Sequence, residues 1–378
     1  MANSNAEHKI EWLLIEDLVC LKEYVAQWQK LVKQSQSNLF CSPEWIMTWI
    51  GIYWQPSWQL KTIVGFENNK LIAIAPLYIQ KSNKFISTIK LLPLGQGEPE
   101  ESEVLSEFQD IILAYKNEYI YVELANQIQA ITFDQLCCNK LLPNSNWHQT
   151  LSNFKSTTFA NTGKRYLITN HQNYLLTLSK NNKSKWKRCQ NKFEKLNTKF
   201  IWVPETHYDE YWKKLISFHQ KRWNNKGKLG AFSHPNFIKF HEIFQQYKNI
   251  KMSAILINQK PIAINYYLYD HDTLYFYQCG WDEKESTTLS PGFSLHIWSI
   301  LNNPMLNYDF MTADTSNSYK SSFARSQPEN IYQAILDKNI IKQHLNKIIK
   351  KTLQKLKKTK INQHSFHIDA FNWNSSNL

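Results

Sequence analysis

The sequence predicts an α/β protein with mixed, largely antiparallel sheets flanked by helices and arranged in two domains. Its 378 residues are enough for two domains of ordinary size. The apolar fraction of 43% and the charged fraction of 20% are typical of a folded globular chain. The most informative observation is the element order between residues 252 and 311, where three strands, a glycine-containing loop, a helix and a fourth strand occur in succession.

Helix and strand patterns alternate in the N-terminal half. Apolar residues recur at helical spacing over 15–33, which predicts one helix there. Ser42 followed by Pro43 is a helix start signal, and it predicts a helix over 45–52. The acidic stretch 95–106 contains Gly and Pro and is expected to be an exposed loop. Strands are predicted over 60–66, 71–79 and 85–92.

The C-terminal half has clearer patterns. The dipeptide Ser290-Pro291 with Gly292 is expected to open an apolar helix over 293–301. Short polar turns at 258–260 and 271–272 separate the three strands that precede this helix. The further helices are predicted over 173–196, 208–223 and 235–247, and the strands over 200–203, 252–257, 261–268, 274–279 and 307–311.

Two short segments suggest an internal duplication. Residues 70–75 read Lys-Leu-Ile-Ala-Ile-Ala and residues 260–265 read Lys-Pro-Ile-Ala-Ile-Asn, each after a strand and a polar turn. A generic β-hairpin is the alternative explanation. From this repeated pattern we expect three parts. They are an N-terminal domain over 1–170, a C-terminal domain over 171–336 of which the first is a degenerate copy, and a basic tail over 337–378.

Charge, cysteines and hydropathy restrict the class of protein. The net charge of +13 is compatible with a phosphate-bearing ligand or an anionic surface, and equally with a Lys- and Asn-rich compositional bias. None of the six cysteines forms a C-x-x-C pair, so no zinc module or other metal site is implied. No stretch approaches the roughly 20 apolar residues of a membrane span, and the N-terminus does not resemble a signal peptide, so we expect a cytoplasmic protein.

Two segments are strongly basic. The tail segment 338–360 has nine lysines, no acid and an apolar stripe, so it is expected either to contact an anionic membrane surface or to pack its stripe on its own domain. The helix around 183–195 places lysines beside Trp186 and Phe193. These aromatics are expected to be its buried face and the lysines its solvent face, so nucleic acid is not the expected partner.

A series of motifs in the chain resembles one known family. In the N-terminal half they are 40–45, Phe-Cys-Ser-Pro-Glu-Trp, and 73–77, Ala-Ile-Ala-Pro-Leu. In the C-terminal half they are 218–223, Phe-His-Gln-Lys-Arg-Trp, then Gly227 and Phe232, and the segments 260–263, 275–280, 290–292, 309–310 and 319–323. In this order, over most of residues 11–324, the set resembles the CelD-like acetyltransferases, GNAT-fold proteins related to the FemAB aminoacyl transferases.

The resemblance implies a GNAT-type fold in tandem, an acyl-CoA donor and an amine or hydroxyl acceptor that attacks the donor directly. Two alternatives stay open. The chain could be a non-catalytic protein of the same fold that binds nucleic acid or a membrane surface, or a FemAB-like transferase that uses aminoacyl-tRNA. The sequence departs from the family pattern at 311–318, where a glycine is usual and none occurs.

The donor would be held where the helix after the three strands begins. A pyrophosphate is favoured at a helix N-terminus, where backbone N–H groups and the helix dipole meet it. Glycine there allows close approach of the backbone. The residues expected to bind the donor are Ser290, Gly292, Phe293 and Ser294.

Catalysis needs a proton acceptor for the attacking amine and a proton donor for the departing thiolate. Asp309 and Asp314 are the candidate acceptors. By their position in the resemblance, Tyr319 is expected to protonate the thiolate and Lys320 to stabilise negative charge. Arg222, Trp223 and Tyr277 are the residues expected to bind the substrate, with an interdomain salt bridge as the alternative for Arg222.

Overall fold

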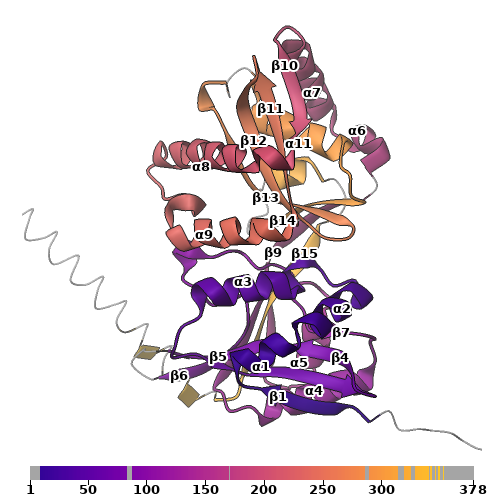
Figure 1. Cartoon of the computed structure of the whole chain (residues 1–378), viewed down its shortest axis with the longest axis vertical. Helices are drawn as coiled ribbons and strands as arrows, with labels where there is room; N and C mark the ends of the chain where they lie inside the picture. Colours follow the sequence, from indigo (N-terminus) through magenta and orange to yellow (C-terminus); the bar gives the residue numbers. More distant parts are fainter. Residues whose placement is uncertain are drawn as a thin grey trace, which may run out of the picture.

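The computed structural model describes residues 9–82, 87–169, 171–285, 289–313, 319–324 and 328–339, and the single residues 341, 342, 345, 348, 349 and 352. Two lobes are stacked along the longest axis, with the N-terminal half below and most of the C-terminal half above (Figure 1). Within the described part of the chain, no helix combines the length and the apolar character that crossing a bilayer requires.

The lower lobe is formed mainly by residues 9–169. Its helices are α1 (Leu18–Glu23), α2 (Val25–Ser35), α3 (Pro43–Tyr53), α4 (Glu118–Ala130) and α5 (Asn146–Leu151). Its strands are β1 (Glu11–Ile15), β2 (Gln59–Leu60), β3 (Thr62–Glu67), β4 (Lys70–Ala75), β5 (Leu77–Ser82), β6 (Thr88–Pro93), β7 (Ile112–Leu113), β8 (Gln135–Leu141) and β9 (Thr157–Thr169).

Two predictions for this lobe are corrected. The helix predicted over 15–33 is a strand end followed by two helices, because the Asp17 side chain caps α1 through the backbone N–H of Val19 and Cys20, and Tyr24 interrupts the helix. The strand predicted over 71–79 is divided at Pro76, and its two parts, β4 and β5, belong to different sheets. Proline has no N–H to donate to a ladder, which favours a break at that position.

The upper lobe follows the predicted order. Its helices are α6 (Tyr174–Thr177), α7 (Lys180–Phe193), α8 (Tyr208–Asn224), α9 (Pro235–Phe244) and α11 (Pro291–Leu301). Its strands are β10 (Thr198–Trp202), β11 (Ile250–Ile257), β12 (Lys260–Tyr269), β13 (Thr273–Trp281) and β14 (Asn307–Ala313), and β15 (Glu329–Asp337) returns to the lower lobe. The single helix predicted over 173–196 is two helices. α6 ends at Thr177, where Leu178 is extended, and α7 begins after its N-cap residue Ser179.

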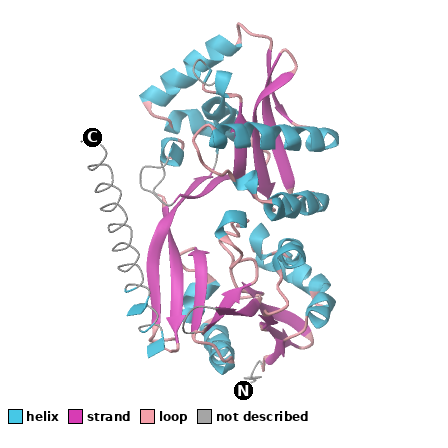
Figure 2. Cartoon of the chain, turned by 90° about the vertical axis from the view of Figure 1, so that its left-hand side faces the viewer, coloured by secondary structure: helices cyan, strands magenta, loops and turns pink. Residues whose placement is uncertain are grey.

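Two sheets form the framework. The first has four strands in the order β1-β3-β4-β7, and the second has eleven in the order β10-β11-β12-β13-β14-β9-β15-β8-β6-β5-β2. β9 lies between β14 of the upper lobe and β15, so the long sheet runs through both lobes, as the side view shows (Figure 2). Most pairings are antiparallel and helices flank both sheets, which confirms the predicted fold class.

The basic segments behave differently from one another. In α7, Trp186 and Phe193 are buried and most of the lysines are exposed, which confirms the predicted orientation of that helix. The predicted tail segment 338–360 lies largely outside the described residues. Three apolar residues of its stripe that are described, Ile341, Leu345 and Ile348, are exposed, so the expected packing of the stripe on the chain's own domain is wrong for them.

Candidate functional site

The site is built where two parallel strands of the upper lobe separate. β13 and β14 pair only from Thr273–Tyr275 against Asn307–Asp309, and beyond this point no pairing between them occurs in the described residues. Two cavities open alongside the separated strands. The α11 cavity has a volume of about 420 Å³ and the β14 cavity about 240 Å³. Both are lined by Arg222, Cys279 and Tyr319, so we treat them together as one groove.

Most of the predicted site residues meet in this groove. Ser290, Gly292 and Phe293 line the α11 cavity, and Trp223, Tyr277 and Lys320 line the β14 cavity. Arg222 and Tyr319 line both. Ser294 does not join them, because its side chain is buried and its hydroxyl donates to the Leu289 carbonyl at 3.2 Å.

The N-terminus of α11 forms one wall of the α11 cavity. Ser290 is the N-cap residue, as expected, but its backbone is left-handed (φ 47°) and its side chain makes no capping hydrogen bond. The first-turn N–H groups are therefore not capped by that side chain, which leaves them to a ligand or water. A Cβ on Gly292 would lie 3.2 Å from the Trp281 ring, so the absence of a side chain allows α11 to approach β13 closely.

Two cations line the α11 cavity over aromatic rings. The Arg222 guanidinium carbon is 3.8 Å from the centroid of the Trp281 ring, and the Lys185 ammonium is 4.3 Å from that of Phe293. A cation over a ring face is stabilised by about 0.5–2 kcal/mol while its other face remains open to an anion. Together with the α11 N-terminus, these residues make one end of the groove suitable for phosphate groups.

The β14 cavity carries a histidine that is held neutral. Trp223 Nε1 donates to His219 Nε2 at 3.0 Å, and His219 Nδ1 lies 3.2 Å from the Gln220 amide oxygen. Burial lowers the pKa of His219 to about 4. Because its Nε2 lone pair already accepts from Trp223, His219 is poorly suited to accept a proton from a substrate.

Tyr319 and Lys320 occupy the segment after β14. Tyr319 is 53% exposed and lines both cavities, and desolvation of its hydroxyl raises its pKa and keeps the phenol protonated. The Lys320 ammonium donates to the Thr312 carbonyl at 2.7 Å, which connects this segment to β14. Cys279 lies beside them as a thiol, with a pKa that burial raises to about 11.

One of the two predicted proton acceptors, Asp309, does not line the groove. Asp309 is fully buried, and its carboxylate accepts from Arg165 Nε at 2.6 Å and from the Met311 backbone N–H at 2.7 Å. Met311 has a positive φ of 60°, so Asp309 holds a bulge in β14 and pairs with β9. Asp314 lies outside the described residues.

A carboxylate that the sequence analysis did not select lies in the groove instead. The segment 95–106, expected to be an exposed loop, is exposed only in part, because Glu100, Glu101 and Glu103 are exposed whereas Glu98, Ser102, Val104 and Ser106 are buried. The Tyr277 hydroxyl donates to the Val104 carbonyl, and Trp45 Nε1 donates to Ser106 Oγ at 2.8 Å. The next residue is Glu107, which is 4% exposed and lines the β14 cavity. Only the acidic composition of the loop hinted at it.

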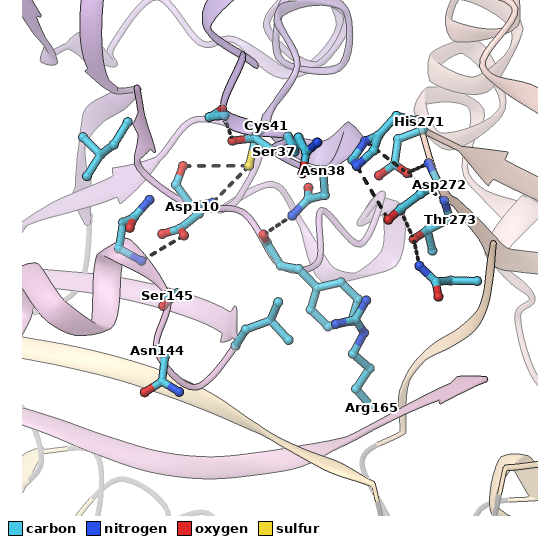
Figure 3. Close-up of a pocket in the computed structure, with 18 of the residues that line it drawn as sticks. Ser37, Asn38, Cys41, Asp110, Asn144, Ser145, Arg165, His271, Asp272 and Thr273 are labelled. Atoms are coloured by element: carbon cyan, nitrogen blue, oxygen red, sulfur yellow. Dashed lines mark hydrogen bonds and ion pairs between the residues drawn. The ribbon is translucent and has the colours of Figure 1, made fainter. Parts of the chain in front are cut away.

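A third cavity lies between the lobes, lined by residues of both. Its volume is about 440 Å³, and Arg165 enters it from β9 while Asp110 and His271 lie on other walls (Figure 3). Asp270, His271 and Asp272 bring one ligand atom each within 4.8 Å of one another at the β12–β13 turn. Asp270 already accepts from the Tyr275 hydroxyl and Asp272 from the Thr273 hydroxyl, and we assign no metal to this turn.

Comparison with known proteins relates the upper lobe to a family of enzymes. Residues 180–321 match the model of the acetyltransferase (GNAT) domain. This range contains α7, α8, β11–β13, α11 and β14, and with them most of the groove. No curated protein sequence matches the chain.

Solved structures resemble the whole chain. The structure of FemX is 10% identical, covers 90% of this chain and 99% of its own, and has a TM-score of 0.57, which shows a shared fold. L-PGS from Bacillus licheniformis is 11% identical over 86% of this chain and 96% of its own, with a TM-score of 0.48. A tandem GNAT protein from the clavulanic acid biosynthesis pathway is 6% identical over 87% and 98%, with a TM-score of 0.42.

Proposed function

We propose that the chain is an acyltransferase that moves an acyl group from acyl-CoA to an amine or hydroxyl acceptor bound in the groove. The observation that carries the proposal is the coincidence of two findings. The match to an acetyltransferase (GNAT) domain covers residues 180–321, and the groove formed by the separation of β13 and β14 lies mainly within it.

The α11 cavity suits the donor. Its cations Arg222 and Lys185 and the open first turn of α11 would meet the phosphates of coenzyme A, while Phe293, Trp281 and Phe323 supply apolar surface for its arm. The acyl thioester would then reach Cys279 and Tyr319, which line both cavities. The β14 cavity, with Trp223 and Lys320, would hold the acceptor.

The residues at the junction suit a direct transfer. The acceptor attacks the thioester carbonyl, and the positive charge of Lys320 stabilises the oxyanion that develops. Tyr319 is held protonated and can give its proton to the departing thiolate. Cys279, whose pKa is raised to about 11, is a poor nucleophile at neutral pH, which favours direct attack over a thioester intermediate on the enzyme.

Ligand-induced stabilisation tests the donor. We expect acetyl-CoA, or an acyl-CoA of longer chain, to raise the thermal midpoint of the full chain, since a ligand at 100 times its Kd adds about 2.7 kcal/mol to the free energy of unfolding. Arg222→Met should weaken the shift. Lys221→Met is the matched control, because Lys221 is exposed on the same helix and does not line the groove. An unchanged midpoint with every acyl-CoA would remove the proposed donor.

A second donor class is favoured by the basic face of α7. Exposed lysines of this helix continue from Lys185 at the cavity over the surface of the upper lobe, which suits a donor with a polyanionic body such as aminoacyl-tRNA. Stabilisation by charged tRNA that falls steeply with salt, without any shift by acyl-CoA, would support this donor. Equal binding of uncharged nucleic acid without turnover would support a non-catalytic protein of the same fold.

A further inference from the structure

We propose that Glu107, contributed by the lower lobe, is the catalytic proton acceptor of the groove and makes a primary amine the acceptor class. The active site is then composite, because the upper lobe binds the donor and the lower lobe supplies the base. The inference rests on the proposed acyl transfer and adds to it the base and the nature of the acceptor.

The position of Glu107 supports this role. Its Oε2 accepts from the backbone N–H of Thr312 on β14 at 2.7 Å, across 205 residues of sequence. This hydrogen bond uses one of about four acceptor positions of the carboxylate. Among the described residues that line the α11 and β14 cavities, Glu107 is the single carboxylate.

The backbone of β14 places Glu107 beside the other reactive groups. The Thr312 N–H binds Glu107, and the Thr312 carbonyl binds the Lys320 ammonium at 2.7 Å, so one peptide segment orients both side chains. Tyr319 precedes Lys320 directly and lines the same cavity. Thr312 therefore positions both the base and the cation that stabilises the oxyanion.

The electrostatic surroundings keep Glu107 able to change its protonation state. Burial raises the pKa of its carboxyl above the ordinary value, and the charges of Lys320 and Lys140 partly offset this rise. The other titratable groups lining the cavity are Arg222, the neutral His219, Cys279 and the tyrosines Tyr277 and Tyr319, whose pKa values are raised by burial. A base is most effective when its pKa approaches the working pH, which a raised carboxyl pKa favours.

The chemical step balances with these residues. An alkylammonium first gives one proton to Glu107, and the neutral amine nitrogen then attacks the thioester carbon, so that a C–N bond forms. The tetrahedral intermediate collapses, the C–S bond breaks, and the thiolate takes the phenolic proton of Tyr319. The second proton passes from the nitrogen to the tyrosinate and the proton on Glu107 is released to solvent, so the net movement is one proton from nitrogen to sulfur and one from nitrogen to solvent.

Glu107 favours an amine through its basicity and not through the net charge of the cavity, because Arg222 and Lys320 line the same walls. An alkylammonium must lose a proton before it can attack, and among the described lining residues Glu107 is the carboxylate that can accept it. Replacement of Glu107 should therefore matter most for amines that arrive protonated.

The test measures thiol release from acetyl-CoA with two probe amines, n-butylamine, which is protonated at neutral pH, and O-methylhydroxylamine, which is not. Glu107→Gln keeps an oxygen that can accept from Thr312, so the fold is expected to survive. We expect its turnover with n-butylamine to fall roughly 10²-fold, its loss with O-methylhydroxylamine to be much smaller, and the acid limb of the wild-type pH profile to disappear. Glu101→Gln, in the same loop but exposed, is the matched control.

The outcomes separate this inference from the proposed function. Unchanged turnover in Glu107→Gln, an equal loss with both amines, or an acid limb that disappears only in Asp314→Asn would each overturn the role of Glu107 while leaving the donor intact. Wild-type protein that acetyl-CoA stabilises but that releases no thiol with either amine would overturn the amine acceptor. Wild-type protein that no acyl-CoA stabilises would overturn the proposed donor itself.

Discussion

The two lobes contain the same hairpin and use it differently. In the lower lobe β3 and β4 are joined by Asn68 and Asn69, and in the upper lobe β11 and β12 are joined by Asn258 and Gln259. All four residues have positive φ, between 49° and 64°. Each hairpin has its register shift two pairs from the turn, at Gly65/Phe66 and at Ile255/Leu256. This agreement supports the internal duplication suggested by residues 70–75 and 260–265.

The lobes differ in the elements that come after the hairpin. In the upper lobe β14 comes after α11 and pairs with β13 over three residues before the strands separate and the groove opens. In the lower lobe β8 comes after α4, and it pairs in parallel with β6 rather than with β7. Leu91 of β6 and Leu136 of β8 are fully buried there. None of the three cavities described above is lined by a residue of β6 or β8, so the duplicated hairpin is not accompanied by a corresponding cavity at these strands.

The lower lobe contributes to the groove through its loop instead. The segment that ends at Glu107 is held between the lobes by Tyr277 and Trp45 and places a carboxylate against β14. The lower lobe in this way supplies part of the wall of the groove that the upper lobe forms. The comparison therefore predicts distinct consequences for changes at β14, in the loop and in the hairpins.

The largest effect on stability is expected at Asp309, where the pairing of β14 with β13 ends. Asp309→Ala removes one partner of a buried ion pair, since the side chains of Arg165 and Asp309 are 13% and 0% exposed. We expect a loss of about 3–5 kcal/mol in the free energy of unfolding, because the Arg165 charge remains buried and keeps Glu329, at 3.3 Å, as its ion-pair partner. Urea-induced unfolding measures this loss.

A paired replacement distinguishes a structural from a catalytic Asp309. Arg165→Met combined with Asp309→Leu should recover much of the stability, since apolar replacement of a buried pair is often close to neutral. If Asp309→Ala instead keeps the wild-type stability and loses turnover, the predicted role of Asp309 in proton transfer would be restored.

An intermediate effect is expected in the loop, through Glu98. Burial raises the pKa of its carboxyl to about 7 from 4.5, although its Oε1 accepts from the Val104 backbone N–H at 3.0 Å. Because the pKa of Glu98 is higher in the folded state, its contribution to the free energy of unfolding is complete below about pH 4.5 and is lost as the pH rises through 7. The loss corresponds to about 3 kcal/mol.

Unfolding at pH 5 and pH 8.5 tests this dependence. Glu98→Gln should reduce the stability difference between the two pH values, whereas Glu101→Gln, exposed in the same loop, should leave it unchanged. The same pH dependence in wild type and Glu98→Gln would mean that another group is responsible.

The smallest effect concerns the two hairpins. Gln259 adopts φ 64° and Asn69 adopts φ 60°, a region that costs most L-residues about 1–2 kcal/mol and asparagine less. Gln259→Gly should therefore stabilise the chain by about 1 kcal/mol and Asn69→Gly by less. Thermal unfolding of both variants measures the difference in stability. An equal gain in the two variants would contradict the lower cost assigned to asparagine at positive φ.

Local chemistry explains why so much of the upper lobe could be predicted. Its strands are separated by turns with Asn, Gln or Asp, its last helix begins at Ser290-Pro291, and each signal acts over a few residues. The candidate residues Arg222, Gly292, Tyr319 and Lys320 are spaced along this framework. Their meeting in one groove therefore needed only the expected strand order.

The predictions for the loop and for Asp309 that the structure corrected failed because they depend on contacts between residues far apart in the sequence. The loop that contains Glu98 has the acids, Gly and Pro of an exposed segment, and its own sequence gives no sign that another lobe covers it. The contact of Glu107 with Thr312 joins residues 205 positions apart, and that of Asp309 with Arg165 joins residues 144 apart. Periodicity over ten or fifteen residues contains no information about such partners.

The sequence by itself determined the elements, the duplicated hairpin and the residues that gather at the end of β13 and the start of α11, because backbone preference and side-chain alternation are local properties. The tertiary structure alone decided which carboxylate faces the groove. Asp309 is turned into an ion pair with β9, and Glu107 enters from the other lobe. A carboxylate's role depends on its burial and its partners, and both are set by the packing of the two lobes.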